Sequence, residues 1–264
     1  EIRLSLVGSE MCIRDRASVD FRIISIGTLA AHPLWGERVP VRTGHATITL
    51  IRSGKSIILV DPGLPDQAVV ARLGERSNLR ASDITHVFLT SFKPDTSRGL
   101  GAFEHAKWWV SGPERERVGI RLISMLKKAS ADGEEKLRQM LERDISHLQR
   151  CEEAPDALAA GVDLFPLPGV TPGLAGLLIE HAQATTIVCG DAVATVEHLA
   201  EGKVLTVCDD MEAARSSFAE AVETADWLIP GRDNLVPSPG RVVQAATGEE
   251  DEDDDIDGDD DDEL

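Results

Sequence analysis

The chain has 264 residues, with 46 acidic and 27 basic side chains, and its formal net charge is −19. Hydrophobic residues make up 42% of the chain, which is enough apolar material for a folded core and too much for a disordered protein. No run approaches the roughly 18 consecutive apolar residues that a membrane-spanning helix needs. The negative charge argues against a nucleic acid or an anionic membrane as the partner.

Both ends of the chain differ in composition from the part between them. Residues 1–16 include LVGSEMCIRDR, which resembles the translation of a sequencing adapter, and we interpret them as an assembly artefact. We expect residues 243–264 to form a disordered acidic tail, because 13 of the last 16 residues are acids and like charges repel. Without those 13 acids, the chain carries 33 acids and 27 bases. We therefore expect one mildly acidic domain over residues 17–242.

Apolar runs rich in β-branched residues predict strands in two batches along the chain. The first batch is Phe21–Thr28, Ala46–Arg52, Ser56–Val60, Ile84–Thr90 and Lys107–Val110. The second batch is Val162–Leu167, Leu177–His181, Thr185–Cys189 and Trp227–Ile229. Helical spacing of apolar residues predicts helices at Ala68–Arg76, at two stretches within residues 113–150 separated by Asp132 and Gly133, and at Met211–Thr224. Near-continuous apolar strands interleaved with helices indicate an α/β fold whose sheets are covered on both faces.

The cysteines favour a reducing compartment. Apart from the artefact segment, the chain contains Cys151, Cys189 and Cys208, and none of them is part of a CxxC pair. This spacing predicts neither a disulfide framework nor a cysteine zinc site. We therefore expect a soluble, cytoplasmic protein.

Five motifs follow one another in a recognisable order. They are SIILVDPG at residues 56–63, DITHVFLTSFKPDTSRGLGAFEHA at 83–106, FPLPGVTPG at 165–173, TTIVCGDAV at 185–193 and DWLIPGRDN at 226–234. In this order and spacing, the chain resembles the metallo-β-lactamase fold superfamily over residues 17–242. The resemblance implies a four-layer αββα sandwich with a pocket where the loops at the strand ends meet. It also implies that residues 113–150 are a helical insertion beside that pocket.

The same resemblance shows that most metal-ligand positions of the family are occupied by other residues here. Two of the seven usual ligands are kept, as Asp95 and Asp191. The five histidine positions are occupied by Ser91, Lys93, Thr96, Val170 and Arg232. Asp61 corresponds to an aspartate that organises the ligands from behind in the family, and His45 precedes a strand that could bring it to the pocket.

The remaining side chains are poor ligands for zinc or iron. Val170 has no lone pair to offer, and the guanidinium of Arg232 stays protonated in proteins. Lys93 could bind a metal only after losing a proton that it normally keeps at neutral pH. Asp95 and Asp191 alone suit a weakly held hard divalent cation such as Mg²⁺. We therefore expect no tightly bound metal or other cofactor.

Two oppositely charged pairs lead to the functional hypothesis. Without a metal, Asp95 and Asp191 would repel each other, and Lys93 and Arg232 bring two positive charges to the same place. We expect these four residues to form a metal-free salt-bridge cluster in a pseudoenzyme that binds a small anionic ligand or a protein partner. The alternative is an active hydrolase of ester, lactone, thioester or phosphodiester bonds. Such a hydrolase would be metal-free, for instance with Ser91 and Lys93 as a nucleophile pair, or would hold a hard cation through Asp95 and Asp191.

Overall fold

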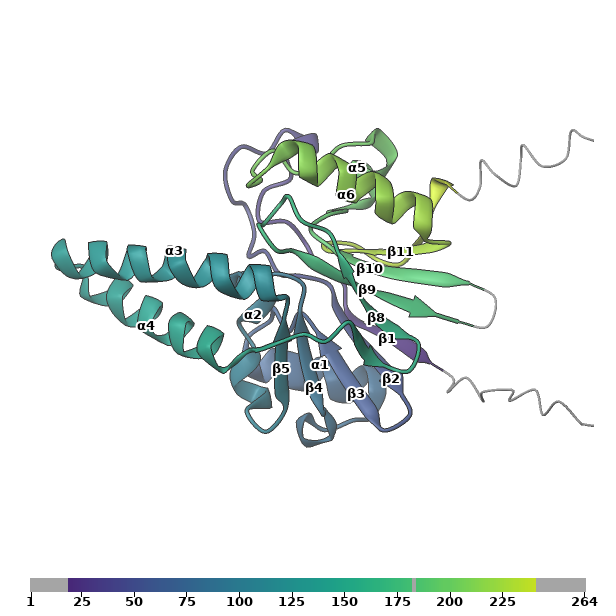
Figure 1. The fold of residues 1–264 in the computed structure, drawn as a ribbon, viewed down its shortest axis with the longest axis horizontal. Helices are drawn as coiled ribbons and strands as arrows, with labels where there is room; N and C mark the ends of the chain where they lie inside the picture. The colour runs from purple at the N-terminus through teal and green to yellow at the C-terminus, as the bar shows by residue number, and fades with distance from the viewer. Residues whose placement is uncertain (1–18, 182–183, 241–264) are drawn as a thin grey trace, which may run out of the picture.

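The structure is a computed structural model that describes residues 19–181 and 184–240 (Figure 1). The expected artefact at residues 1–16 and the expected tail at residues 243–264 lie outside the described residues. The described strands form two six-stranded sheets, in the orders β1-β2-β3-β4-β5-β6 and β12-β11-β10-β9-β8-β7. Each sheet therefore takes one of the two batches of strands that the sequence predicts.

The first sheet combines an antiparallel and a parallel half. Its strands are β1 (Asp20–Ser25), β2 (Ile48–Ser53), β3 (Ser56–Val60), β4 (His86–Leu89), β5 (Lys107–Val110) and β6 (Glu152–Glu153). Strands β1 to β3 pair antiparallel, whereas β3 to β6 pair parallel. Because parallel neighbours need crossover connections, helices follow these strands. They are α1 (Asp66–Ser77), α2 (Pro94–Ser97), α3 (Gly112–Ala131) and α4 (Glu135–Arg150), with short 3-10 turns at Pro33–Trp35, Ala81–Asp83 and Leu100–Phe103.

The second sheet is mostly antiparallel. Its strands are β7 (Ala157–Ala159), β8 (Val162–Pro166), β9 (Ala175–Glu180), β10 (Thr185–Gly190), β11 (Trp227–Pro230) and β12 (Val236–Pro237). Its one parallel pair, β10 with β11, is connected through α5 (Val196–Glu201) and α6 (Met211–Thr224). A parallel crossover therefore places the ends of β10 and β11 beside each other, as it does for β3 and β4.

Three apolar clusters show that the sheets and helices stack in four layers. The first cluster joins α1 to the first sheet, with Val69 and Leu73 against Leu59 and Val87. The second lies between the two sheets and contains Ile58, Phe88, Leu177 and Val188. The third joins the second sheet to the helices beyond it and contains Ile187, Leu228, Ala214 and Ala221. This is the αββα sandwich that the resemblance implies.

The helices α3 and α4 form a hairpin that projects from the sandwich (Figure 1). Gly133 has a left-handed φ of 72°, which favours glycine and separates the two helices at the position that the sequence predicts. Ser111 begins the hairpin, because its side chain accepts a hydrogen bond from Glu114 N in the first turn of α3. Among the described residues, no helix is both long enough and apolar enough to cross a membrane.

Candidate functional site

The candidate site lies where the loops after three strands meet. Lys93 and Asp95 follow β4, Asp191 follows β10 and Arg232 follows β11. The ends of β10 and β11 are neighbours because these strands pair parallel. The loops come together in three dimensions, since Lys93 contacts Asp191 across 98 positions of sequence.

Arg232 is the centre of a cluster of ion pairs. Its Nε and Nη2 lie 2.7 Å from Asp191 Oδ1 and 2.9 Å from Asp191 Oδ2, so both carboxylate oxygens accept hydrogen bonds from one guanidinium. Its Nη1 lies 2.5 Å from Asp95 Oδ2. Lys93 Nζ lies 3.0 Å from Asp191 Oδ2. We call Lys93, Asp95, Asp191 and Arg232 the ion-pair cluster; its two positive and two negative charges balance.

Burial strengthens the electrostatic interactions between the charged groups of this cluster. Asp191 and Arg232 are each 4% exposed, whereas the side chains of Lys93 and Asp95 are each 30% exposed. Burial opposes ionisation of the Asp191 carboxyl, but the charges of Arg232 and Lys93 outweigh it and hold its pKa well below the usual range. Burial likewise opposes the charge of Arg232, yet Asp191 and Asp95 raise its pKa further above the ordinary value. Asp191 and Arg232 are therefore both ionised at neutral pH.

Two glycines let the loops of the site approach closely. A Cβ atom on Gly63 would lie 1.8 Å from the carbonyl oxygen of Asp95. A Cβ atom on Gly231 would lie 2.5 Å from the carbonyl carbon of Gly190. Only glycine fits at such distances, so the backbone around Asp95 and Arg232 is held in place by direct loop-to-loop contact.

The other predicted residues surround the cluster without joining its ion pairs. Asp61 follows β3 with a φ of 49°, and its carboxylate accepts hydrogen bonds from the backbone N and the hydroxyl of Thr90 at 2.8 and 2.6 Å. Burial raises the pKa of Asp61 to about 7 in spite of these bonds. His45 Nε2 lies 3.2 Å from Ile26 O, and burial lowers the pKa of the ring. Val170 lies in the third apolar cluster, with Leu167 and Leu174.

Ser91 and Lys93 are not paired as a nucleophile and base. No hydrogen bond between Ser91 Oγ and Lys93 Nζ occurs in the described part of the chain, and Ser91 Oγ is buried there without a hydrogen-bond partner. Lys93 Nζ is instead held by Asp191. Thr96 Oγ1 lies 2.6 Å from Ser91 O and accepts a hydrogen bond from Lys93 N, so it shapes this loop. The Ser91–Lys93 alternative therefore gains no support from the geometry.

Glu114 is a site residue that the sequence analysis did not identify. Its fully buried carboxylate accepts hydrogen bonds from Phe92 N at 3.0 Å and from Gly173 N at 3.1 Å. It therefore ties the first turn of α3 to the loop that carries Lys93 and to the 165–173 motif. The sequence contains a signal for it, because S-x-x-E at residues 111–114 is the pattern of a helix N-terminal capping box.

We expect Glu114→Gln to lower the free energy of unfolding by about 2 kcal/mol, because one amide oxygen replaces two acceptors and leaves a buried N–H unpaired. Urea unfolding of the two proteins measures this difference. Glu116→Gln, at an exposed position one half-turn further along α3, is the matched control and should change stability by less than about 0.5 kcal/mol. Equal, small effects of both changes would contradict the role of Glu114.

A second group of interacting side chains, centred on two buried histidines, lies outside the ion-pair cluster. His32 and His198 are each 2% exposed and share the hydroxyl of Thr195, at 3.2 Å from His32 Nε2 and 2.9 Å from His198 Nδ1. His32 Nε2 also lies 3.3 Å from Glu197 Oε2, and its ring stacks on Trp35. Nothing in the sequence spacing indicates this contact, because 163 positions separate His32 and Thr195. The group attaches the loop before β2 to the start of α5.

The residues at the family's metal positions do not fit a zinc or iron pair. A catalytic zinc needs about three protein ligands and an open position for water. Here both oxygens of Asp191 are already bound by cationic side chains, and Val170 carries no donor atom. Within residues 19–181 and 184–240, no group of three or more histidine, cysteine, aspartate or glutamate side chains is arranged to hold a metal ion.

Comparisons with known proteins agree with the fold. Residues 41–242 match the family model described as the metallo-beta-lactamase superfamily. A Staphylococcus aureus protein described as a probable metal-dependent hydrolase is similar in structure, with a TM-score of 0.61, 15% identity and coverage of 85% of this chain and 94% of that one. No curated protein matches the sequence.

Two lactonases are also similar in structure. AidC, described as a dizinc quorum-quenching lactonase, has a TM-score of 0.56 and 19% identity, and the match covers 74% of each chain. A quorum-quenching N-acyl homoserine lactone lactonase has a TM-score of 0.57 and 22% identity, covering 81% of this chain and 91% of that one. At these identities, the likeness concerns the fold.

Proposed function

The chain belongs to the metallo-beta-lactamase superfamily, and from that premise we propose that it is a pseudoenzyme that binds a small anionic ligand at the ion-pair cluster. The observation that carries the proposal is the double occupation of Asp191 by Arg232 and Lys93. Three hydrogen bonds from two cationic side chains already use most of the roughly four lone-pair sites of the Asp191 carboxylate, so a metal ion would have to compete with both positive charges. Binding, which needs neither a metal nor an activated water, is the activity that these side chains support.

Lys93 is the group on which an anion would bind. Its ammonium has three N–H donors, and Asp191 uses one of them. Its side chain is 30% exposed, so a carboxylate or phosphate group can reach the remaining donors from solvent. Arg232 is buried and stays paired with Asp191 and Asp95, so the ammonium group of Lys93 is the cationic group of the cluster that an anion can reach. The described cysteines are free, which suits the reducing cytoplasm that we propose as the location.

The alternative is a hydrolase that uses no metal or a hard cation between Asp95 and Asp191. The alternative is supported by the two lactonases that are similar in structure, but their sequences are no more than 22% identical to this chain. Arg232 contacts Asp95 and Asp191 at once, so a hard cation would have to displace Arg232 from both carboxylates. The ion pairs therefore favour the binding function.

Metal content separates the two functions. We expect less than about a tenth of an equivalent of zinc, iron or manganese by mass spectrometry after the folded protein has been exposed to each metal and freed of excess. One or two equivalents, lost in both Asp95→Ala and Asp191→Ala, would overturn the proposal and favour the hydrolase. The anion is tested on the same protein with inorganic phosphate and acetate. At least one of them should raise Tm in the wild type and fail to do so in Lys93→Ala; no response to either would contradict binding at Lys93.

A further inference from the structure

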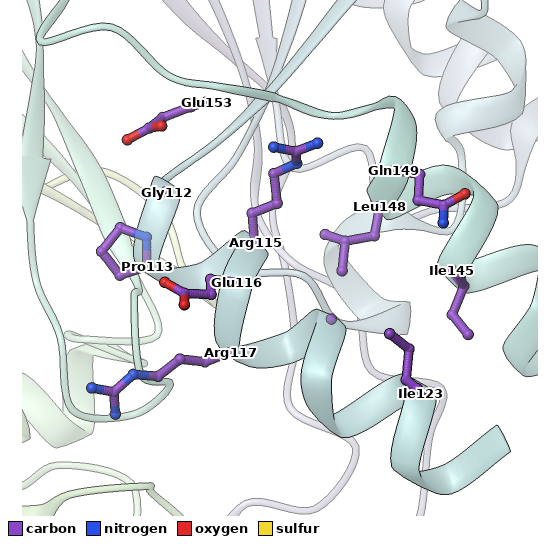
Figure 2. Close-up of a pocket in the computed structure, with 11 residues that line it drawn as sticks. Gly112, Pro113, Arg115, Glu116, Arg117, Ile123, Ile145, Leu148, Gln149 and Glu153 are labelled. Atoms are coloured by element: carbon purple, nitrogen blue, oxygen red, sulfur yellow. The ribbon is translucent and has the colours of Figure 1, made fainter. Parts of the chain in front are cut away.

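A groove on the projecting hairpin lies outside the ion-pair cluster. It has a volume of about 710 Å³, which is in the range of small-molecule sites. The first turns of α3 form one side, the last turns of α4 form the other, and Glu153 of β6 closes one end (Figure 2). No residue of the ion-pair cluster lines it.

The arginines of the hairpin differ according to whether they line this groove. Four of the six bind oxygen atoms of the protein: Arg121 binds Asp209, Arg138 binds Glu135 and Glu142, Arg143 binds Asp144 and Arg150 binds the carbonyl of Glu104. The other two, Arg115 and Arg117, are the ones that line the groove. Neither forms an ion pair with any carboxylate of the described residues. An unpaired guanidinium group beside a groove provides a binding place for an anionic group.

Arg115 is the better placed of the two. Figure 2 shows its side chain lying between Gln149 and Glu153, whereas Arg117 extends the other way. The side-chain amide of Gln149 supplies a second hydrogen-bond donor on the opposite wall. An anion held by Arg115 would also lie near the start of a 20-residue helix, where the helix dipole favours negative charge.

Apolar side chains continue the groove away from Arg115. Leu148 is 4% exposed and forms the floor, Ile145 is half-buried, and Ile123 is 47% exposed although it is large and apolar. Arg115 and Ile123 are eight residues apart on α3, which corresponds to roughly 12 Å along the helix. A ligand with a charged head and an extended apolar chain therefore matches the order of groups along the groove.

The acidic residues of the rim restrict the charge of the ligand. Glu116 and Glu153 balance Arg115 and Arg117, so the groove has no net charge. Such a groove suits a single negative charge and disfavours a polyanion such as a nucleic acid or the acidic segment 249–264. A monocarboxylate with an alkyl chain carries a single negative charge, and its charged head and apolar chain follow the order of groups along the groove.

We propose that the groove between α3 and α4 binds a medium-chain monocarboxylate. Arg115 and Gln149 hold the carboxylate, and the alkyl chain lies over Leu148, Ile145 and Ile123. The site is independent of the anion proposed at Lys93, because the two groups of residues do not overlap. Arg115 directly follows Glu114, so this site adjoins the turn that holds the loop of the ion-pair cluster.

Calorimetric titration of the full chain with decanoate, below its micellar concentration, tests the proposal. We expect one equivalent to bind, and Arg115→Gln to weaken binding by at least about tenfold through the loss of a charged hydrogen bond. Arg138→Gln, which changes a paired arginine of the same hairpin, should leave binding unchanged. Decyltrimethylammonium, which has an alkyl chain of similar length and the opposite charge, should bind the wild type no more tightly than decanoate binds Arg115→Gln.

Three results would overturn the site. The first is no binding of decanoate, and the second is equal binding of decanoate and decyltrimethylammonium, which would mean that the carboxylate is not recognised. The third is binding that is unchanged in Arg115→Gln but lost in Lys93→Ala, which would place the carboxylate at the ion-pair cluster. Failure of the decanoate site with an intact phosphate or acetate response at Lys93 would leave the proposed function standing.

Discussion

Arg232→Met should lower the free energy of unfolding by about 3–5 kcal/mol, because it leaves the buried charge of Asp191 without its two-bond partner. Asp191 is 4% exposed and would keep Lys93 as its remaining cationic neighbour. Methionine fills much of the same space and cannot donate a hydrogen bond. Chemical denaturation at neutral pH measures the loss, and a loss below about 1 kcal/mol would contradict the central role given to Arg232.

The stability difference between the wild type and Arg232→Met should depend on pH. In the wild type the pKa of Asp191 is held down, since the charges of Arg232 and Lys93 outweigh its burial, so its contribution to stability is present above the unfolded value near 3.9. That contribution is lost as the pH falls through the folded value. In Arg232→Met the effect of burial on the pKa of Asp191 is less opposed. The difference in stability between the two proteins should therefore shrink as the pH falls below about 4.

A second change tests whether the loss comes from the unpaired charge. In Arg232→Met combined with Asp191→Leu, both members of the buried pair are apolar. Replacing a whole buried ion pair by apolar residues is often neutral, so the double variant should recover most of the stability lost in Arg232→Met. A double variant as unstable as Arg232→Met would instead point to lost packing.

Lys93→His combined with Arg232→His should convert the ion-pair cluster into a zinc site. The double variant removes both cations from Asp191 and offers two imidazoles and two carboxylates from the same four positions. Four such ligands suit zinc. We expect about one equivalent of zinc in the variant, against less than about a tenth in the wild type.

Zinc should also stabilise the double variant, because it binds the folded state only. Thermal unfolding with and without zinc measures this effect, and circular dichroism confirms that the metal-free variant is folded. The matched control adds Asp191→Asn, which should weaken zinc binding. A folded double variant without zinc would mean that more of the five replaced histidines are needed for a site.

The elements with the clearest patterns were predicted closely. Strands β3 and β5 and helix α6 have the predicted bounds, and α3 and α4 separate at Asp132 and Gly133. The short helices α2 and α5 and the short strands β6, β7 and β12 were not predicted. Strands of two or three residues are too short to show alternation, and helices of four or six residues are too short to show a repeat of 3.6, so contacts elsewhere in the fold determine them. Successive side chains of a strand point to opposite faces, so Trp108 and Trp109 of β5 are buried in different clusters, the first and the second.

For the candidate site too, some features follow from the sequence alone and others only from the tertiary structure. The sequence by itself determined that Val170 and Arg232 offer a metal no lone pair, because this follows from the side chain alone. It also placed two carboxylates and two cations at the ends of strands. Only the tertiary structure decided that one guanidinium spans Asp95 and Asp191, and that Glu114 holds two loops. These contacts join segments that are far apart in the chain. Their geometry depends on how the two sheets and the α3–α4 hairpin pack together, and local sequence patterns do not predict that packing.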